Sequence, residues 1–224
     1  MKLKKIGSLA LAGIMAVSML TACSGKTDES GEGNGNGDVT PSSTYTSTVM
    51  SATDATTQAL FKVGSSTQLD GAVRYVAANG SYGTIQDTLT VIEGDDWQEL
   101  AAKYMGNAVY ATGDMEDETK YDSEAGGASI KQLVGSKDVT VYTMFAVSRK
   151  YNDEYIDKLV ADKVNGIAVA LNSSIPDDNN TYDYTINISK ADSQKSKNEA
   201  DKDVDSVIVG IAITLDYTGA SFNA

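Results

Sequence analysis

Runs of β-branched and aromatic residues recur along this chain and predict β-strands. The clearest runs cover residues 84–92, 139–148, 182–189 and 207–217. The last of these is the longest and most apolar, which is typical of a strand buried on both faces. We therefore expect it at the centre of a sheet. A shorter apolar run, 167–171, predicts another buried strand.

Two segments carry apolar residues at helical spacing. In the first, Asp96 and Glu99 have the spacing of a capping box. One apolar face then follows, formed by Trp97, Leu100, Ala101, Tyr104 and Met105, and Gly106 is expected to end the helix. In the second, Asn152 or Asp153 is the expected cap. Its apolar face consists of Tyr155, Ile156, Leu159, Val160 and Val164, before an expected stop at Asn165-Gly166.

Together these elements predict an α+β domain. We expect a mostly antiparallel sheet of about five strands, with the two main helices on one face. The segments 113–127 and 190–203 are rich in charged residues and are expected to be solvated loops. The order strand, helix, strand occurs at about 84–112 and again at 139–171. A diverged duplication would explain this recurrence, but we favour chance repetition of a common unit.

The amino terminus has the layout of a secretory signal. An apolar segment, 6–20, follows three basic residues, Lys2, Lys4 and Lys5. The segment is short for a membrane span, which needs roughly 20 apolar residues. We therefore expect residues 1–22 to be a signal peptide.

The end of this signal resembles the lipobox of bacterial lipoproteins. All four positions match, in the sequence Leu20-Thr21-Ala22-Cys23. The resemblance implies that Cys23 is alkylated with diacylglycerol, that cleavage occurs before it, and that its new amino group is usually acylated. One acyl chain anchors a protein only marginally, whereas two or three attach it durably. The alternative is an ordinary signal peptide that contains a cysteine.

This resemblance predicts the organisation of the whole chain. Residues 1–22 are the expected signal peptide, 23–44 the lipidated cysteine with a flexible tether rich in Gly, Asp and Ser, and 45–224 a single extracytoplasmic domain. The composition of the tether is that of a flexible coil. We expect a protein anchored through Cys23 to membrane lipid on the outer face of the cell membrane, with a Gram-positive envelope favoured.

Charge and composition narrow the chemistry of the domain. Removal of the signal peptide leaves 15 basic and 31 acidic residues, a net charge of −16. Nucleic acid is therefore not an expected partner, because its binding requires basic surfaces. The chain has no histidine and one cysteine, the expected anchor. This excludes Ser-His-Asp and Cys-His catalysis, disulfides, and zinc sites built on His or Cys. No cofactor or metal is expected.

Residues 90–95 read Thr-Val-Ile-Glu-Gly-Asp, and Leu-Ala follows at 100–101. The stretch 90–106 resembles the front half of a LysM module, a family that binds the N-acetylglucosamine backbone of peptidoglycan or chitin. The resemblance implies a glycan site that uses Asp95, Trp97 and Tyr104. The second helix and closing strand of that family are not recognisable in this chain. A capped amphipathic helix explains the same residues.

Acidic residues suggest two further hypotheses, a calcium-binding loop and a carboxylate-based hydrolase. Asp201, Asp203 and Asp205 begin like an EF-hand loop, but Ser206 and Ala212 stand where that loop needs Gly and Glu. We interpret them as a solvated run of charge. Paired carboxylates are the machinery of glycoside hydrolysis, so a carboxylate-based hydrolase stays open, without an assigned catalytic residue. The leading interpretation is a non-catalytic lipoprotein domain that binds a ligand, wall polymer or partner protein.

Overall fold

The computed structural model describes residues 39–79, 82–85, 87–92, 95–111, 115, 130–197 and 203–220. Cys23, the tether before residue 39 and most of the predicted acidic loop lie outside this part of the chain. The elements, in chain order, are β1 (Val39–Thr40), α1 (Ser42–Ser51), α2 (Ala55–Leu60), β2 (Phe61–Val63), α3 (Thr67–Asn79), β3 (Tyr82–Thr84), β4 (Thr90–Val91), α4 (Asp95–Met105), β5 (Val109–Tyr110), the 3-10 helix η1 (Ile130–Val134), β6 (Val139–Ser148), α5 (Asp153–Ser174), β7 (Thr181–Lys197) and β8 (Asp203–Thr218). The fold therefore already includes residues 39–44, which the sequence assigned to the tether.

Three long antiparallel strands form the centre of the sheet, in the order β7, β8, β6. Short strands line the two edges. β1, β2 and β3 pair with β7, and β4 and β5 pair with β6. The α+β class and the mostly antiparallel sheet are confirmed, and β8 takes the central place predicted for 207–217. The sheet has eight strands among the described residues, more than the five expected.

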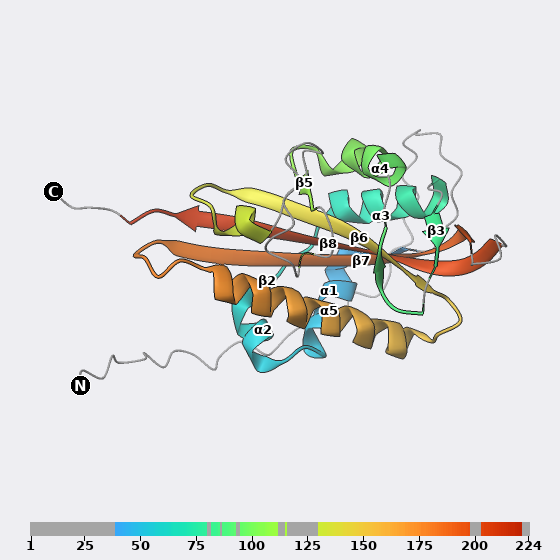
Figure 1. The fold of residues 1–224 in the computed structure, drawn as a ribbon, viewed down its shortest axis with the longest axis horizontal. Coiled ribbons are helices and arrows are strands. Elements are labelled where there is room, and N and C mark those ends of the chain that lie inside the picture. The colour runs from blue at the N-terminus through green and yellow to red at the C-terminus, as the bar shows by residue number, and fades with distance from the viewer. Residues whose placement is uncertain are drawn as a thin grey trace, which may run out of the picture. The chain divides into compact units, whose positions relative to one another are not determined.

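Helices cover both faces of this sheet (Figure 1). α1 and α5 pack on one face, and α3 and α4 pack on the other. The expectation that the two main helices share a face is therefore wrong. The reason lies in β8, whose side chains alternate between the faces: Val209 and Ile211 join one apolar cluster, and Ile208 and Ala212 join the other. Because both faces of the strand are apolar, each needs its own cover.

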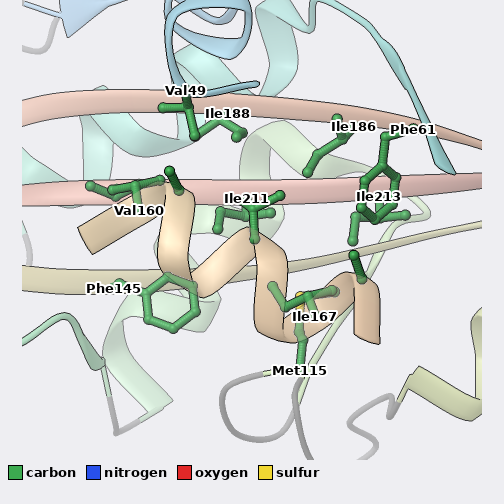
Figure 2. Packing of buried hydrophobic residues seen from close by; sticks show 14 of the residues in the cluster. Val49, Phe61, Met115, Phe145, Val160, Ile167, Ile186, Ile188, Ile211 and Ile213 are labelled. Atoms are coloured by element: carbon green, nitrogen blue, oxygen red, sulfur yellow. The ribbon is translucent and has the colours of Figure 1, made fainter. Parts of the chain in front are cut away.

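The α5 side holds the larger apolar cluster. Figure 2 shows Val160 and Ile167 of α5 beside Ile211 and Ile213 of β8. The apolar stripe of α5 continues past Gly166, so the helix extends to Ser174 instead of ending at 165–166. The predicted strand 167–171 is part of this helix, and the second strand–helix–strand unit therefore has no closing strand. Asn152 is the observed cap, its Oδ1 accepting from the Tyr155 N–H at 3.0 Å.

Two other expectations need correction. The segment 190–203, predicted as a loop, is strand as far as Lys197, because β7 pairs with β8 along nearly its whole length. The predicted strand 84–92 is divided between the end of β3 and the two-residue β4. Among the described helices, none has the length and hydrophobicity that crossing a membrane requires.

The α3 side packs closely because β8 carries a glycine beneath the helix. A Cβ built on Gly210 would lie 2.5 Å from Cγ2 of Val73 and 3.0 Å from Cδ1 of Leu69. Both α3 side chains are fully buried. The glycine therefore sets how near α3 approaches the sheet.

Replacement of Gly210 by leucine is expected to lower the free energy of unfolding by about 1–3 kcal/mol, because an overpacked core forces side chains or helix to shift. Urea denaturation measures the change. Asp205→Asn, on an exposed position of the same strand, is the matched control and should change stability by less than about 0.5 kcal/mol. Equal stability of the two variants would show that α3 does not rest on Gly210.

Candidate functional site

The residues of the LysM-like stretch lie on α4. Asp95 and Trp97 belong to its first turn, and their side chains lie outside the described part of the structure. Tyr104 belongs to its last turn, about 13 Å farther along the helix axis than Asp95. The helix itself and its end at Gly106, which has φ +59°, agree with the prediction. The three residues implied by the resemblance are therefore spread over the length of one helix.

Tyr104 packs against α3. Its ring centroid lies 5.5 Å from that of Tyr75, and a Cβ on Gly71 would come within 2.6 Å of its Cδ1. Lys103 lies over the Tyr75 ring at 5.1 Å. The ring of Tyr104 is thus used to join α4 to α3, although 40% of the residue remains exposed.

A cavity of about 550 Å³ lies on the same face of the sheet, beside the first turn of α3 and the end of α4. Its floor comes from β7, β8 and β6, and its walls come from both helix ends and from the segment that joins η1 to β6. We call it the amide groove. Its lining consists of Ser66, Gln68, Met105, Asn107, Ala108, Val109, Gln132, Lys137, Asp138, Val139, Thr140, Asn187, Ala212 and Thr214.

Four side-chain amides meet in this groove from four parts of the chain. Gln68 lies in the first turn of α3, Asn107 follows the left-handed Gly106, Gln132 lies in η1 and Asn187 lies in β7. Each amide offers both a hydrogen-bond donor and an acceptor. The groove therefore presents mixed polarity without depending on charge.

Its charged groups balance. Lys137 and Asp138 are the only charged residues among the described residues of the lining. Asp138 is also engaged, since its Oδ1 accepts from the Tyr217 N–H at 2.8 Å. The chain as a whole has a net charge of −13, so the neutral lining of the groove differs from the acidic character of the rest of the chain.

Asn187 is the most unusual member of the lining. The residue is 7% exposed, and its Oδ1 is the only buried side-chain oxygen or nitrogen in the described structure that has no hydrogen-bond partner. The oxygen faces Gly64, where a Cβ would lie only 2.5 Å away. Leaving such a group unpaired costs about 1–3 kcal/mol. The fold thus bears a cost at Asn187 that no contact within the described structure repays.

Replacement of Asn187 by leucine is therefore expected to leave the free energy of unfolding unchanged or to raise it by up to about 2 kcal/mol, because an apolar group of similar shape removes an unpaired polar atom. Denaturant unfolding of the variant measures this. Thr46→Val is the matched control, since the Thr46 hydroxyl accepts from the Ile188 N–H at 2.9 Å. That variant should lose about 1–3 kcal/mol. A similar loss in Asn187→Leu would contradict the unpaired state of its Oδ1.

The corner of the groove next to Gln68 is held by hydrogen bonds. Ser66 Oγ accepts from the Leu69 N–H at 3.1 Å and so caps α3. The Ser66 N–H donates to Ser42 Oγ at 2.7 Å, and the Ser42 N–H donates to Asp70 Oδ1 at 2.7 Å. The starts of α1 and α3 are tied together by these bonds. The wall is therefore positioned before any ligand arrives.

The floor carries a row of hydroxyls. Thr140 and Thr214 of the lining face each other across β6 and β8, and Thr185, which is not part of the lining, pairs with Thr214 from β7. The Oγ1 atoms of Thr140 and Thr214 lie 2.9 Å apart and share a hydrogen bond. This row adds donors and acceptors beside Asn187 and Ala212.

A second cavity, of about 540 Å³, lies between β1, α1 and the start of α5 and contains a network of charges. Lys190 Nζ lies 2.8 Å from Asp157 Oδ1 and 3.0 Å from Asp153 Oδ1. Arg149 bonds Asp153 at 2.9 Å and Asp192 at 3.1 Å. The Tyr45 hydroxyl donates to Asp157 Oδ1 at 2.8 Å. Every carboxylate of this network is thus paired with a cation.

This network has poor chemistry for hydrolysis. Hydrogen bonds from Arg149 and Lys190 hold the pKa of Asp153 below its ordinary value. A general acid needs the opposite, a raised pKa that keeps the proton at neutral pH. The amide groove contains a single carboxylate, Asp138. Neither cavity presents the pair of acid and base that a glycosidase requires.

The predicted run of charge around Asp203 also differs from a calcium loop. Asp203 and Asp205 lie in β8, in an extended conformation instead of the tight turn of an EF-hand. Among the residues that the structure describes, no three His, Cys, Asp or Glu side chains gather as a metal site would require.

No protein-family model matches this chain, and no curated protein or solved structure shows significant similarity to it. None of the candidate site residues chosen from the sequence, Asp95, Trp97 and Tyr104, is in the described lining of the groove, and the α4 segment reaches it only at Met105.

Proposed function

We propose that this chain is an extracytoplasmic lipoprotein, anchored through Cys23 in the cell membrane, whose domain is a non-catalytic binding module that holds its ligand in the amide groove. The anchor is supported by the basic start, the apolar segment and the complete tetrad at residues 20–23. The binding site is supported by the concave, pre-positioned lining of the groove.

The observation that carries the binding proposal is the buried, unpaired Oδ1 of Asn187. Buried polar groups in folded proteins are nearly always paired, and an exception needs an explanation. Here the exception lies in the lining of a cavity whose size is within the usual range for ligand sites, about 300–1,000 Å³. A bound ligand that bonds the amide would repay its cost.

The anchor has a direct test. Replacement of Cys23 by alanine removes the thiol that receives the lipid, so the protein should leave the membrane fraction almost completely. We expect wild-type protein to partition into Triton X-114 detergent and to show a diacylglyceryl-modified amino terminus by mass spectrometry. An unmodified cysteine at that position, or unchanged partitioning of the variant, would contradict the lipoprotein assignment.

The binding site is tested by hydrogen exchange of the full chain mixed with a muramidase digest of bacterial cell wall, which supplies soluble glycans and peptides together. Binding in the groove should slow amide exchange in segments 66–69, 107–109 and 137–140. The Asn187→Leu variant should lose this protection while its exchange elsewhere is unchanged. Protection confined to the first turns of α4 would instead favour the LysM-like alternative.

A further inference from the structure

The lining of the amide groove also constrains which ligand fits it. We propose that the ligand is an uncharged peptide segment, held in extended form by hydrogen bonds between its main-chain amides and the side-chain amides of the groove. This inference rests on the proposed binding function and specifies the ligand class of the same site.

The charge of the groove favours a neutral ligand. Lys137 and Asp138 cancel, and no other charged side chain among the described residues reaches the lining. The chain as a whole carries 31 acidic residues, so the field around the groove repels anions. A cationic ligand would need acidic groups in the lining beyond Asp138. A neutral ligand is not repelled by the acidic chain and needs no additional acidic groups in the lining.

The side chains of the lining favour a peptide over a sugar. The flat apolar faces of sugar rings are usually covered by aromatic side chains. The chain has twelve tyrosines, yet no aromatic residue is present in the described lining of the groove. Its apolar members carry no ring that could stack on a sugar: Met105, Ala108, Val109, Val139 and Ala212. These surfaces suit small aliphatic side chains.

The polar members match a peptide main chain. A peptide unit offers one N–H donor and one C=O acceptor, and each side-chain amide of Gln68, Asn107, Gln132 and Asn187 offers the complementary pair. The Asn187 oxygen faces Gly64 in the described state. The terminal torsion of asparagine is soft, and the proposal requires the amide to turn on ligand binding so that its oxygen comes within reach of a ligand N–H.

The length of the groove agrees with a short extended segment. Asn187, Thr214 and Thr140 lie on three adjacent strands, β7, β8 and β6. Adjacent strands are about 4.8 Å apart, so the floor spans about 10 Å. An extended chain advances about 3.3 Å per residue, so about three residues cross this distance.

The test uses saturation-transfer NMR on the full chain in detergent, with two neutral probes of similar size: acetyl-Ala-Ala-Ala-amide and N,N′-diacetylchitobiose. We expect the tripeptide to bind and the sugar not to bind. Each of Gln68→Ala, Asn107→Ala and Gln132→Ala should weaken tripeptide binding about two- to tenfold, the effect of one hydrogen bond. The matched control is Asn79→Ala, an exposed amide at the opposite end of α3, which should leave affinity unchanged.

Three results would overturn the inference. Binding of the sugar alone, lost in the three groove variants, would keep the groove as the binding site and reject the peptide. Binding of the tripeptide that is equal in all variants would place it elsewhere on the molecule. Absence of binding by both probes would reject the peptide as ligand, and absence of protection in the exchange experiment would then reject the groove as well.

Discussion

Replacement of Lys190 by methionine is expected to lower the free energy of unfolding by about 2–4 kcal/mol, because it leaves the half-buried Asp157 without its cation. Asp153 keeps its bond to Arg149. The Lys190 side chain is only 11% exposed, and Asp157, its nearer partner, is 21% exposed. The ammonium also lies 4.5 Å from the centre of the buried Tyr45 ring. One side chain thus joins α1, α5 and β7, so its loss acts on three elements.

The chain offers a matched control in Lys62→Met. Lys62 also pairs with an aspartate, Asp183 at 3.0 Å, but both side chains are well exposed, at 66% and 47%. An exposed pair of this kind contributes about 0–1 kcal/mol. Chemical denaturation of both variants measures the free energy of unfolding that each lysine contributes. If Lys190→Met costs no more than Lys62→Met, burial of the network does not contribute to stability.

Stability is also expected to fall steeply above pH 10, because three buried tyrosines resist ionisation in the fold. Burial raises the pKa of Tyr142 to about 12 and raises the pKa of Tyr45 and Tyr184 well above the ordinary value. For Tyr45, the charge of Asp157 adds to the effect. The unfolded chain releases these protons near pH 10, whereas the folded chain keeps them.

The direction of the pH effect follows from this difference. The stability associated with each neutral phenol is complete below pH 10 and declines as the pH rises toward the folded pKa. For Tyr142 the expected loss at pH 12 is about 2 kcal/mol relative to pH 8. Urea unfolding at both pH values measures it, and Tyr142→Phe should reduce the difference by that amount. An unchanged pH dependence in Tyr142→Phe would contradict the assignment.

The sequence predicted the centre of the fold well, because the strongest signals there are local. The apolar run that became β8 is buried on both faces, and β6 matches the predicted residues 139–148. The errors concern places where packing outweighs local preference. Asn165-Gly166 is a common helix stop, but Ile167 and Leu171 continue the buried stripe of α5. The cost of one glycine inside a helix, about 1 kcal/mol, is smaller than the gain from their burial.

Contacts with other elements also explain why β7 continues to Lys197. Residues 190–197 are polar and charged, which favours a loop, yet Lys190 is neutralised by Asp153 and Asp157. Ala191 and Ser193 are buried on the α3 side of the sheet, where the Ser193 hydroxyl donates to the Ala77 carbonyl at 2.7 Å. These partners come from α5 and α3, so no pattern within β7 itself indicates them.

The amide groove was not predictable from the sequence. Its four amides are isolated residues at positions 68, 107, 132 and 187, and isolated Asn and Gln are ordinary on any protein surface. The one local signal was Gly106, expected as a helix end, because the residue after such a glycine leaves the helix in a new direction. The neutrality of the groove becomes visible only when its lining is compared with the acidic composition of the chain.

Under the proposed function, Asn187 is kept for a ligand and not for the fold. The most direct measurement combines two readouts on Asn187→Leu in the full chain: denaturant unfolding and binding of acetyl-Ala-Ala-Ala-amide. We expect a variant at least as stable as the wild type that binds the peptide at least fivefold more weakly. A variant that is less stable by more than about 1 kcal/mol, or one that binds as the wild type does, would contradict the claim.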